Sequence, residues 1–285
     1  MKILGVTFAL LAAALAVVAS KESPTAVSRI RVPASGIQPE VEVKDGIVHM
    51  IYFSGEDLHG DLFYVRSRDW GKTLSTPIRV NSPGSAVAVG AIRGAQLAIG
   101  RNGRAHVAWN GSDKAQPRNG KEPPMLYARL NDAGTAFEPE RNLITAAWGL
   151  NGGGTIAADA QGGVYVFWHA PDPGISPNEA NRRVWMAKSS DDGKSFAKET
   201  VIYQPKTGVC GCCGMHAYAG ADGALHVLFR SAFETVHRDM YLLTSLDRGR
   251  TFEGENVSKW NIGACVMSSE AFAQQKDVTL AAWET

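Results

Sequence analysis

Four cysteines are the residues whose type and spacing point most directly to chemistry. Three lie in the stretch C-G-C-C-G-M-H, and the full set is Cys210, Cys212, Cys213 and Cys265. In an exported chain clustered cysteines form disulfides by default, and four cysteines allow three pairings. The alternative is a soft-metal site, in which thiolates together with Met215 and His216 bind copper or zinc. We expect disulfides and no bound metal, and the pairing is left open.

Charged side chains in four long polar stretches form the second group of candidates. These stretches follow apolar runs and cover residues 54–61, 110–124, 169–183 and 230–239. Arginines and carboxylates in such loops suit an anionic or polyhydroxyl ligand, because a guanidinium pairs bidentately with a carboxylate. Exposed loops are often charged without binding anything, so a solvated surface is the alternative for each residue. The candidates for catalysis are Arg93, Arg230, Glu234, Arg238 and Asp239.

Five apolar runs must position these loops. Each run alternates in the manner of a strand and ends in an aromatic residue; these are Phe53, Trp109, Trp168, Phe229 and Trp283. The first four follow a glycine-containing turn, and the runs recur about every 60 residues, which is typical of a repeat architecture. Histidine recurs at one strand position, as His49, His106 and His226. We therefore expect these histidines to be packing residues and not ligands.

A turn motif of the form S-x-D-x-G-x-[ST]-[FW] recurs at the same period. It covers residues 189–196 and 245–252, and residues 67–74 with Leu74 in place of the aromatic residue. A weaker copy lies at 130–137, and the aspartates are Asp69, Asp132, Asp191 and Asp247. An aspartate accepts hydrogen bonds from nearby backbone N–H groups, and glycine supplies the positive φ that a tight turn needs. These aspartates are therefore expected to hold turns and to do no chemistry.

The repeated motif resembles the Asp box, or BNR repeat, of the sialidase superfamily, and the chain resembles sialidase-like exported bacterial proteins. The resemblance implies an all-β propeller of four-stranded blades, six-bladed in type, with the Asp boxes on the face opposite the active site. The repeats place blades at about 34–82, 90–144, 150–204 and 208–258. A fifth unit from Trp260 to Thr285 stops after two strands. We expect residues 21–285 to be one propeller domain from a longer protein; five irregular blades are the alternative.

Blade alignment also brings the cysteines together. Matching Phe229 with Trp283 sets Cys265 opposite position 211 in the preceding blade. A disulfide between blades, from Cys212 or Cys213 to Cys265, is therefore compatible with the predicted fold.

The sialidase mechanism that the resemblance implies uses three arginines, a tyrosine activated by a glutamate, and an aspartate as acid/base. The first arginine of the family lies in an R-I-P motif at the start of the first blade. Here Gln38-Pro39 occupies that place, and R-V-P occurs earlier, at Arg31. Either Arg31 acts from a shifted position or this arginine is absent. The family's tyrosine and last arginine lie in late blades.

The N-terminus carries targeting information. Residues 1–20 combine Lys2, an apolar run and small residues at Ala19 and Ser20, which is typical of a signal peptide. We expect a secreted or periplasmic protein; a single membrane anchor is the alternative, although the apolar run is short for a span. The formal net charge of +1 gives no reason to expect a nucleic-acid partner, and no cofactor is expected.

Two functions from different classes follow from the sequence. The first is a secreted glycoside hydrolase of exo-α-sialidase type that acts on terminal acidic sugars. The second is a non-catalytic Asp-box propeller that binds glycan or protein. Turnover of a sialoside would distinguish them, because fold alone does not determine function.

Overall fold

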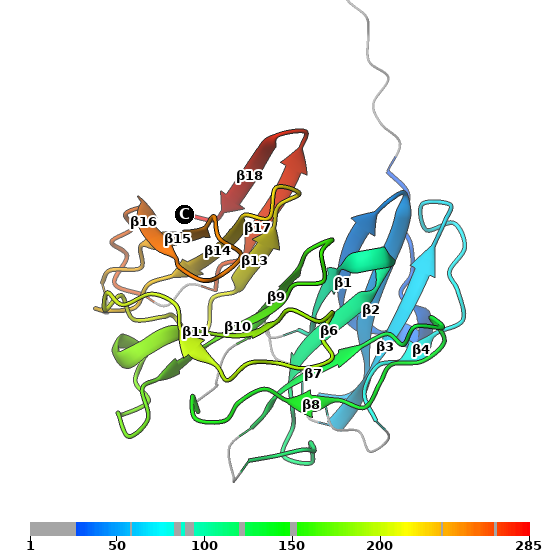
Figure 1. Ribbon diagram of the computed structural model, residues 1–285, viewed down its shortest axis with the longest axis horizontal. Coiled ribbons are helices and arrows are strands. Elements are labelled where there is room, and N and C mark those ends of the chain that lie inside the picture. The colour runs from blue at the N-terminus through cyan, green and yellow to red at the C-terminus, as the bar shows by residue number, and fades with distance from the viewer. Residues whose placement is uncertain are drawn as a thin grey trace, which may run out of the picture. The chain divides into compact units, whose positions relative to one another are not determined.

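A computed structural model describes residues 27–57, 59–82, 87–88, 94–119, 123–148, 153–234, 236–264 and 267–285. Residues 31–285 form one compact unit whose regular elements are β-strands and a few short 3-10 turns (Figure 1). The expected signal peptide, residues 1–20, lies outside the described residues. No helix among the described residues is long and apolar enough to span a membrane.

Four antiparallel sheets of four strands follow one another along the chain, as the repeats predicted. The first contains β1 (Ile37–Lys44), β2 (Ile47–Glu56), β3 (His59–Ser67) and β4 (Ile78–Arg79). The second contains β5 (Gln96–Ile99), β6 (Ala105–Asn110), β7 (Met125–Arg129) and β8 (Arg141–Asn142). The third contains β9 (Thr155–Ala158), β10 (Val164–Pro171), β11 (Arg182–Ser189) and β12 (Thr200–Val201). The fourth contains β13 (Met215–Ala219), β14 (Leu225–Arg230), β15 (Met240–Ser245) and β16 (Glu253–Ser258).

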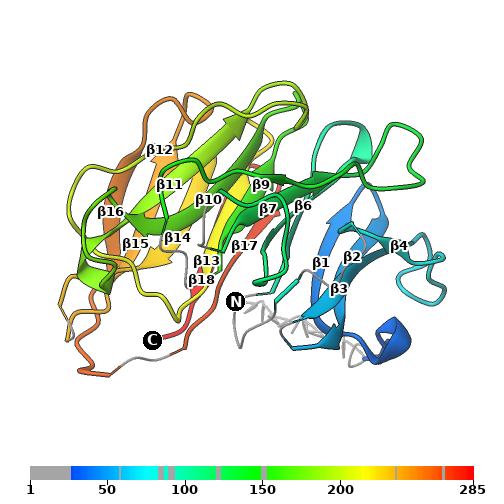
Figure 2. The same ribbon diagram turned by 90° about the horizontal axis from the view of Figure 1, so that it is seen from below.

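A hairpin of β17 (Glu270–Gln275) and β18 (Val278–Trp283) follows the fourth sheet. Three short 3-10 turns complete the described elements: η1 (Pro33–Ser35), η2 (Arg101–Gly103) and η3 (Glu179–Asn181). The first strands of the successive units contact one another in the order β1, β5, β9, β13 and β17 (Figure 2). The architecture is therefore the all-β propeller type predicted from the sequence.

The core lies between the faces of neighbouring sheets. One apolar cluster joins the first and second sheets, with Phe53 and Trp109 in it, and a second joins the second and third around Trp168. A third cluster joins the third and fourth sheets and contains Phe229. The aromatic residues that close these four strands are at most 2% exposed. Burying such large side chains between sheets supplies much of the favourable free energy of folding.

The three complete Asp boxes hold turns, as expected. In the box between β11 and β12, Asp191 accepts hydrogen bonds from the Ser189 hydroxyl at 2.7 Å and from the Ser195 backbone and hydroxyl at 2.9 and 2.6 Å. Gly193 donates its N–H to Ser189 Oγ and has a φ of 76°, which favours glycine. Asp69 and Asp247 make the matching contacts in the first and fourth sheets.

The weaker copy between β7 and β8 folds differently. Here the side chain of Asn131 accepts the backbone hydrogen bonds of Thr135 and Ala136. Asp132 instead forms an ion pair with Arg104. The acceptor of this turn is thus shifted by one residue, which accounts for the poor match of residues 130–137 to the motif.

The recurring histidines are packing residues, which confirms the prediction. His49 Nδ1 lies 2.6 Å from the hydroxyl of Tyr64, and His106 Nδ1 lies 2.7 Å from that of Tyr127. His226 Nδ1 lies 3.2 Å from Thr244 Oγ1. Burial lowers the pKa of His49 to about 4, so its ring is neutral at physiological pH.

Candidate functional site

The first residues of the innermost strands surround a central cavity of about 480 Å³. Its walls come from the starts of β1, β5, β13 and β17 and from the residues just before β9. Each innermost strand is antiparallel to the second strand of its sheet, and the second strand is antiparallel to the third. The first and third strands therefore run in the same direction. The Asp boxes follow the third strands. The cavity therefore opens on the face opposite the Asp boxes, where the resemblance placed a site.

Three carboxyl groups line this cavity: Glu40 and Glu42 on β1 and Glu270 on β17. Burial raises the pKa of Glu40 to about 7, and the neighbouring charge of Glu42 adds to the rise. Burial also raises the pKa of Glu42 to about 7, although Lys44 opposes it. Near neutral pH these groups exist partly as neutral acids, so they can donate hydrogen bonds as well as accept them.

Glu270 is the most deeply buried of the three. Its side chain is 8% exposed, and neither of its carboxyl oxygens has a hydrogen-bond partner among the described residues. Burial raises the pKa of Glu270 to about 8, against the lowering effect of Arg230. A buried polar group without a partner costs free energy, and a ligand that supplies the missing hydrogen bonds would recover it.

The remaining lining combines amide, imidazole and aromatic groups. Gln38 and Gln96 contribute side-chain amides, and His216 and Phe272 contribute rings whose centroids are 6.0 Å apart. Burial lowers the pKa of His216, which keeps its ring neutral. No lysine or arginine is among the described residues that line the cavity. The cavity thus offers hydrogen-bonding groups and an aromatic ring, with a charge that ranges from neutral to negative.

Two of the arginines predicted for catalysis, Arg230 and Arg238, do not line the cavity. Arg230, at the end of β14, is 1% exposed and donates to Ser268 Oγ and to the carbonyls of Arg238 and Glu284. Its guanidinium also lies 4.5 Å from the ring centroid of Trp260. Arg238 is 5% exposed and donates to Glu179 Oε2 at 2.9 Å. Both guanidiniums are thus engaged within the protein, and neither lines the cavity.

Glu234 and Asp239 do not line the cavity either. Glu234 is exposed and lies 3.7 Å from the ring of His237, on the surface. Asp239 accepts hydrogen bonds from the Asn256 side chain and the Trp260 backbone, which ties the loop to β16. Arg93 lies outside the described residues. The structure therefore gathers Arg230, Arg238 and Asp239 into a packed framework around Trp260 and leaves Glu234 in solvent.

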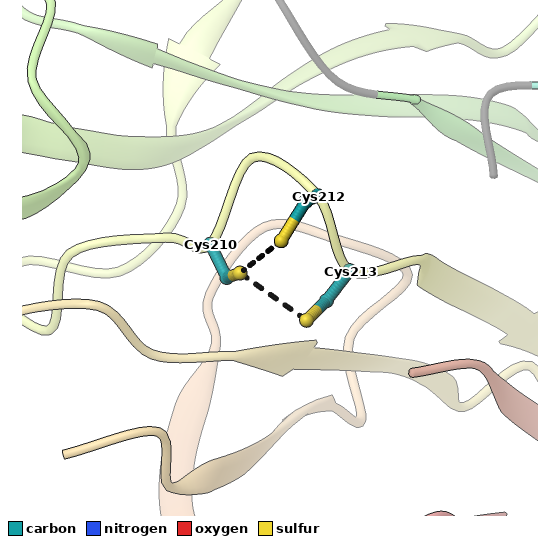
Figure 3. Close-up of side chains that lie close together, drawn as sticks. All are labelled: Cys210, Cys212 and Cys213. Atoms are coloured by element: carbon teal, nitrogen blue, oxygen red, sulfur yellow. Dashed lines mark hydrogen bonds between the residues drawn. The ribbon is translucent and has the colours of Figure 1, made fainter. Parts of the chain in front are cut away.

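The cysteine cluster occupies the connection between the third and fourth sheets (Figure 3). Cys210 Sγ lies 3.4 Å from Cys212 Sγ and 3.2 Å from Cys213 Sγ. Cys210 and Cys213 carry thiols, and no disulfide joins two of the described residues. Cys265 lies outside the described residues, so the expected disulfide between blades is not tested. The three described sulfurs lie within 4.8 Å of one another.

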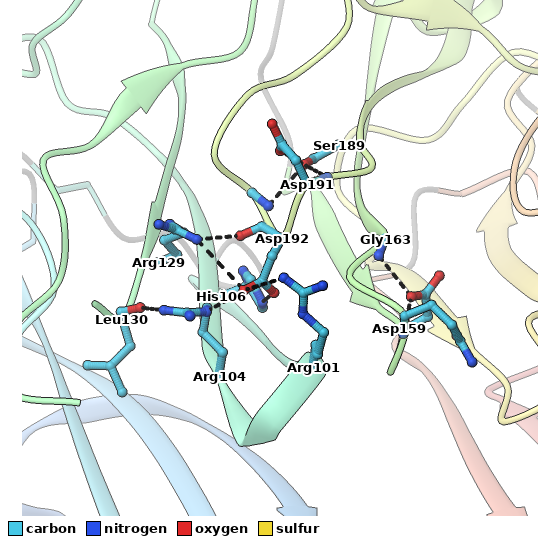
Figure 4. Close-up of polar contacts among 12 residues, drawn as sticks. Arg101, Arg104, His106, Arg129, Leu130, Asp159, Gly163, Ser189, Asp191 and Asp192 are labelled. Carbon is cyan, nitrogen blue, oxygen red and sulfur yellow. Dashed lines mark hydrogen bonds and ion pairs between the residues drawn. The ribbon is translucent and has the colours of Figure 1, made fainter. Parts of the chain in front are cut away.

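Sequence reasoning missed a buried ionic cluster around Asp192 (Figure 4). The Asp192 carboxylate is 2% exposed and receives Arg104 Nε at 2.6 Å, with His106 Nε2 at 3.5 Å. Arg129 donates to the Asp192 carbonyl at 2.9 Å. Burial alone would raise the pKa of Asp192, but contacts with His106 and Arg104 outweigh it and lower the value to about 2. The cluster lies at the Asp-box end and binds the third sheet to the second.

The missed cavity residues did leave a signal in the sequence. In I-Q-P-E-V-E-V, the alternation puts Gln38, Glu40 and Glu42 on one side of a strand, and in the structure these three are more buried than their neighbours. Two glutamates at partly buried positions are unusual unless they serve a site. The alternation in β1 could have identified this strand as part of a cavity lining, but it could not show that Glu270 lines the same cavity.

The sequence matches no known protein-family profile and no curated protein. Solved structures do resemble the chain in fold. Trypanosoma rangeli sialidase in complex with sialic acid matches with a TM-score of 0.56 and 16% identity, over 92% of this chain and 45% of the sialidase. A Hadza microbial sialidase matches with a TM-score of 0.52 and 16% identity, over 83% of this chain and 49% of that protein.

An enzyme of another class shares the same fold. An ulvan lyase from a polysaccharide lyase family matches with a TM-score of 0.54 and 15% identity, over 87% of this chain and 62% of the lyase. The chain thus spans less than half of the length of both sialidases. At these identities the likeness shows a sialidase-like propeller fold, and function has to be argued from the cavity.

Proposed function

We propose that this protein binds carbohydrate in the central cavity, and that neutral or amino sugars suit it better than acidic sugars. The observation that carries the proposal is the lining, in which three carboxyl groups, two amides and an aromatic ring converge without a lysine or arginine among the described residues. Carboxyls and amides form hydrogen bonds with sugar hydroxyls. An aromatic ring packs against the apolar face of a sugar. Proteins of this fold that act on carbohydrates support the ligand class.

The preference between sugars follows from charge. A carboxylate on the ligand would face Glu40, Glu42 and Glu270, and like charges in a partly buried site repel. An ammonium group would instead pair with the same side chains as they ionise. Exo-α-sialidase activity on terminal acidic sugars stays the alternative. It has less support, because neither Arg230 nor Arg238 reaches the cavity.

A direct test compares three probes by isothermal titration calorimetry: a chitosan oligosaccharide, a neutral chito-oligosaccharide and sialyllactose. We expect binding of the first two and weaker or no binding of the third. Glu270→Gln should weaken binding of the chitosan probe about tenfold, the loss expected for one hydrogen bond to a buried carboxyl group. The matched control is Glu253→Gln on β16, which is exposed and distant from the cavity lining, and it should bind like the wild type.

Two kinds of result would contradict the proposed binding of neutral or amino sugars. Tight binding of sialyllactose alone, or turnover of a fluorogenic sialoside, would favour the sialidase alternative. If no sugar bound, or if Glu270→Gln and Glu253→Gln behaved alike, the cavity would not be the glycan site.

We further propose that the chain is exported. The support is Lys2 followed by an apolar run with small residues near position 20. Fractionation of cells that produce the full chain should find the protein in the periplasm or the medium, about 20 residues shorter than the translated sequence. Retention of the full-length chain in the membrane fraction would indicate an anchor instead.

A further inference from the structure

Cys210 and Cys213 form a C-x-x-C pair that the glycan site does not use. Their side chains are 2% and 3% exposed, and their sulfurs lie 3.2 Å apart (Figure 3). Both carry thiols. We propose that Cys210 and Cys213 are a redox-active dithiol, which interconverts with an intramolecular disulfide by exchange with small-molecule disulfides. This inference does not depend on glycan binding.

Three separate segments hold the pair in place. The backbone N–H of Cys210 donates to the carbonyl of Arg230 on β14 at 2.9 Å. Gly211 donates to Glu179 Oε1 in the loop between β10 and β11 at 2.7 Å. Gly214 donates to the carbonyl of Ser268, just before β17, at 2.9 Å. Because the loop is fixed on both sides of the cysteines, closing the S–S bond needs little further ordering of the chain.

The two thiols differ in a way that assigns their roles. The Cys210 thiol donates a hydrogen bond to Cys213 Sγ, which lowers the pKa of Cys213 to about 6, with help from Ser268 and against burial. The same hydrogen bond and burial raise the pKa of Cys210. The charged groups that face the pair are Glu179 on the side of Cys210 and Glu270 on the side of Cys213. Cys213 is therefore the attacking thiolate and Cys210 the resolving thiol.

The exchange balances in two steps. The Cys213 thiolate attacks one sulfur of a small disulfide such as oxidised glutathione, which forms a mixed disulfide and releases one glutathione thiolate. The Cys210 thiol then loses its proton and attacks Cys213 Sγ, which forms the protein disulfide and releases the second glutathione thiolate. Protons from the two protein thiols end on the two glutathione molecules. The protein loses two electrons, and the small disulfide gains them.

The test uses the full chain carrying Cys212→Ser and Cys265→Ser, which leaves only the pair in question. The protein is equilibrated in buffers with varied ratios of reduced to oxidised glutathione, quenched with acid, denatured and alkylated. Mass spectrometry then counts the modified thiols. We expect the count to fall from two to zero per chain in one reversible two-electron transition, with loss of the mass of two hydrogens. Circular dichroism checks that the variant folds.

Single variants and the wild-type chain make the test decisive. Cys210→Ser should accumulate a mixed disulfide with one glutathione on Cys213, because the resolving thiol is gone. Cys213→Ser should react far more slowly. Peptide mapping of oxidised wild-type protein should find Cys210 joined to Cys213, even if the double variant does not fold. Two reactive thiols at every ratio would overturn the proposal. So would either cysteine joined to Cys212 or Cys265, or a bound metal ion that protects both thiols.

Discussion

Glu270 shows how burial changes what a carboxyl group can do. In water it would be fully ionised at neutral pH, whereas at the start of β17 its pKa is raised to about 8. It is therefore largely a neutral acid at neutral pH, and so can donate a hydrogen bond to a ligand oxygen. Glu40 and Glu42 lie across the same cavity with pKa values raised to about 7. The three groups ionise over a narrow pH range, so the net charge of the cavity changes strongly with pH near neutrality.

The raised pKa of Glu270 predicts how stability changes with pH. The folded protein holds a proton that the unfolded chain releases near pH 4.5. The contribution of protonated Glu270 to the free energy of unfolding is thus fully present below about pH 4.5, and it is lost as the pH rises toward about 8. Glu270→Gln cannot ionise, so its free energy of unfolding should fall less than that of the wild type between about pH 5 and about pH 8. Urea unfolding at several pH values measures this, with Glu253→Gln as control. Equal falls for Glu270→Gln and wild type would contradict it.

At the scale of elements, each innermost strand does two tasks at its two ends. Its first residues line the cavity, and its last residues lead into the turn on the Asp-box face. The distance between neighbouring sheets must therefore be maintained along the full length of the innermost strands. Near the Asp-box end, the pairing of Asp192 with Arg104 and Arg129 holds the third sheet against the second. Along the rest of these strands, the apolar cluster between the second and third sheets keeps the two sheets packed together.

Removal of Asp192 should destabilise the protein strongly. Asp192→Ala removes the buried carboxylate that Arg104 contacts at 2.6 Å and Arg129 at 3.7 Å, and leaves Asp132 and Glu138 as the remaining partners of the two guanidiniums. Breaking a buried ion pair completely costs about 3–5 kcal/mol, so we expect a loss of about 3 kcal/mol, at the lower end of that range. Asp172→Ala is the matched control, because Asp172 pairs with Arg183 at 3.3 Å while its own side chain is 47% exposed. Because its carboxylate is half exposed to solvent, this pair should contribute at most about 1 kcal/mol. Chemical denaturation measures both, and similar losses would show that the Asp192 cluster does not join the sheets.

At the scale of the whole molecule, the sheets differ in how well they are covered. Every residue of β10 in the third sheet is buried, whereas most residues of β18 are exposed. Local opening requires less free energy where few apolar contacts are lost. Hydrogen exchange followed by mass spectrometry should therefore find slow exchange in β10 and fast exchange in β17 and β18. Equal protection of the two regions would indicate that the molecule opens only as a single unit.

The fold could be predicted from the sequence because its signals are local. Asp191 and Gly193 define a turn within a few residues, and Trp168 closes a short apolar run that is buried along its whole length. The site could not be predicted in the same manner, because it depends on which strands meet. Arg230 looked like a ligand-binding residue, yet Trp260 and Ser268 engage its guanidinium. Glu270 could not be predicted, because no residue near it in the sequence indicates that it lies on the same cavity as Glu40.

The placement of the Asp boxes and the cavity at opposite ends of the same strands has a consequence for how such proteins diversify. Substitutions at Gln38, Glu40 or Glu270 would change the cavity lining and leave the Asp-box turns, which lie at the other end of the strands, intact. Because each sheet contributes its own few side chains, descendants of one ancestor can acquire new specificities one sheet at a time. Relatives of this chain should then keep the turn residues while their cavity residues diverge. Similar turn residues would then indicate common ancestry, whereas the cavity residues would differ according to the ligand of each relative.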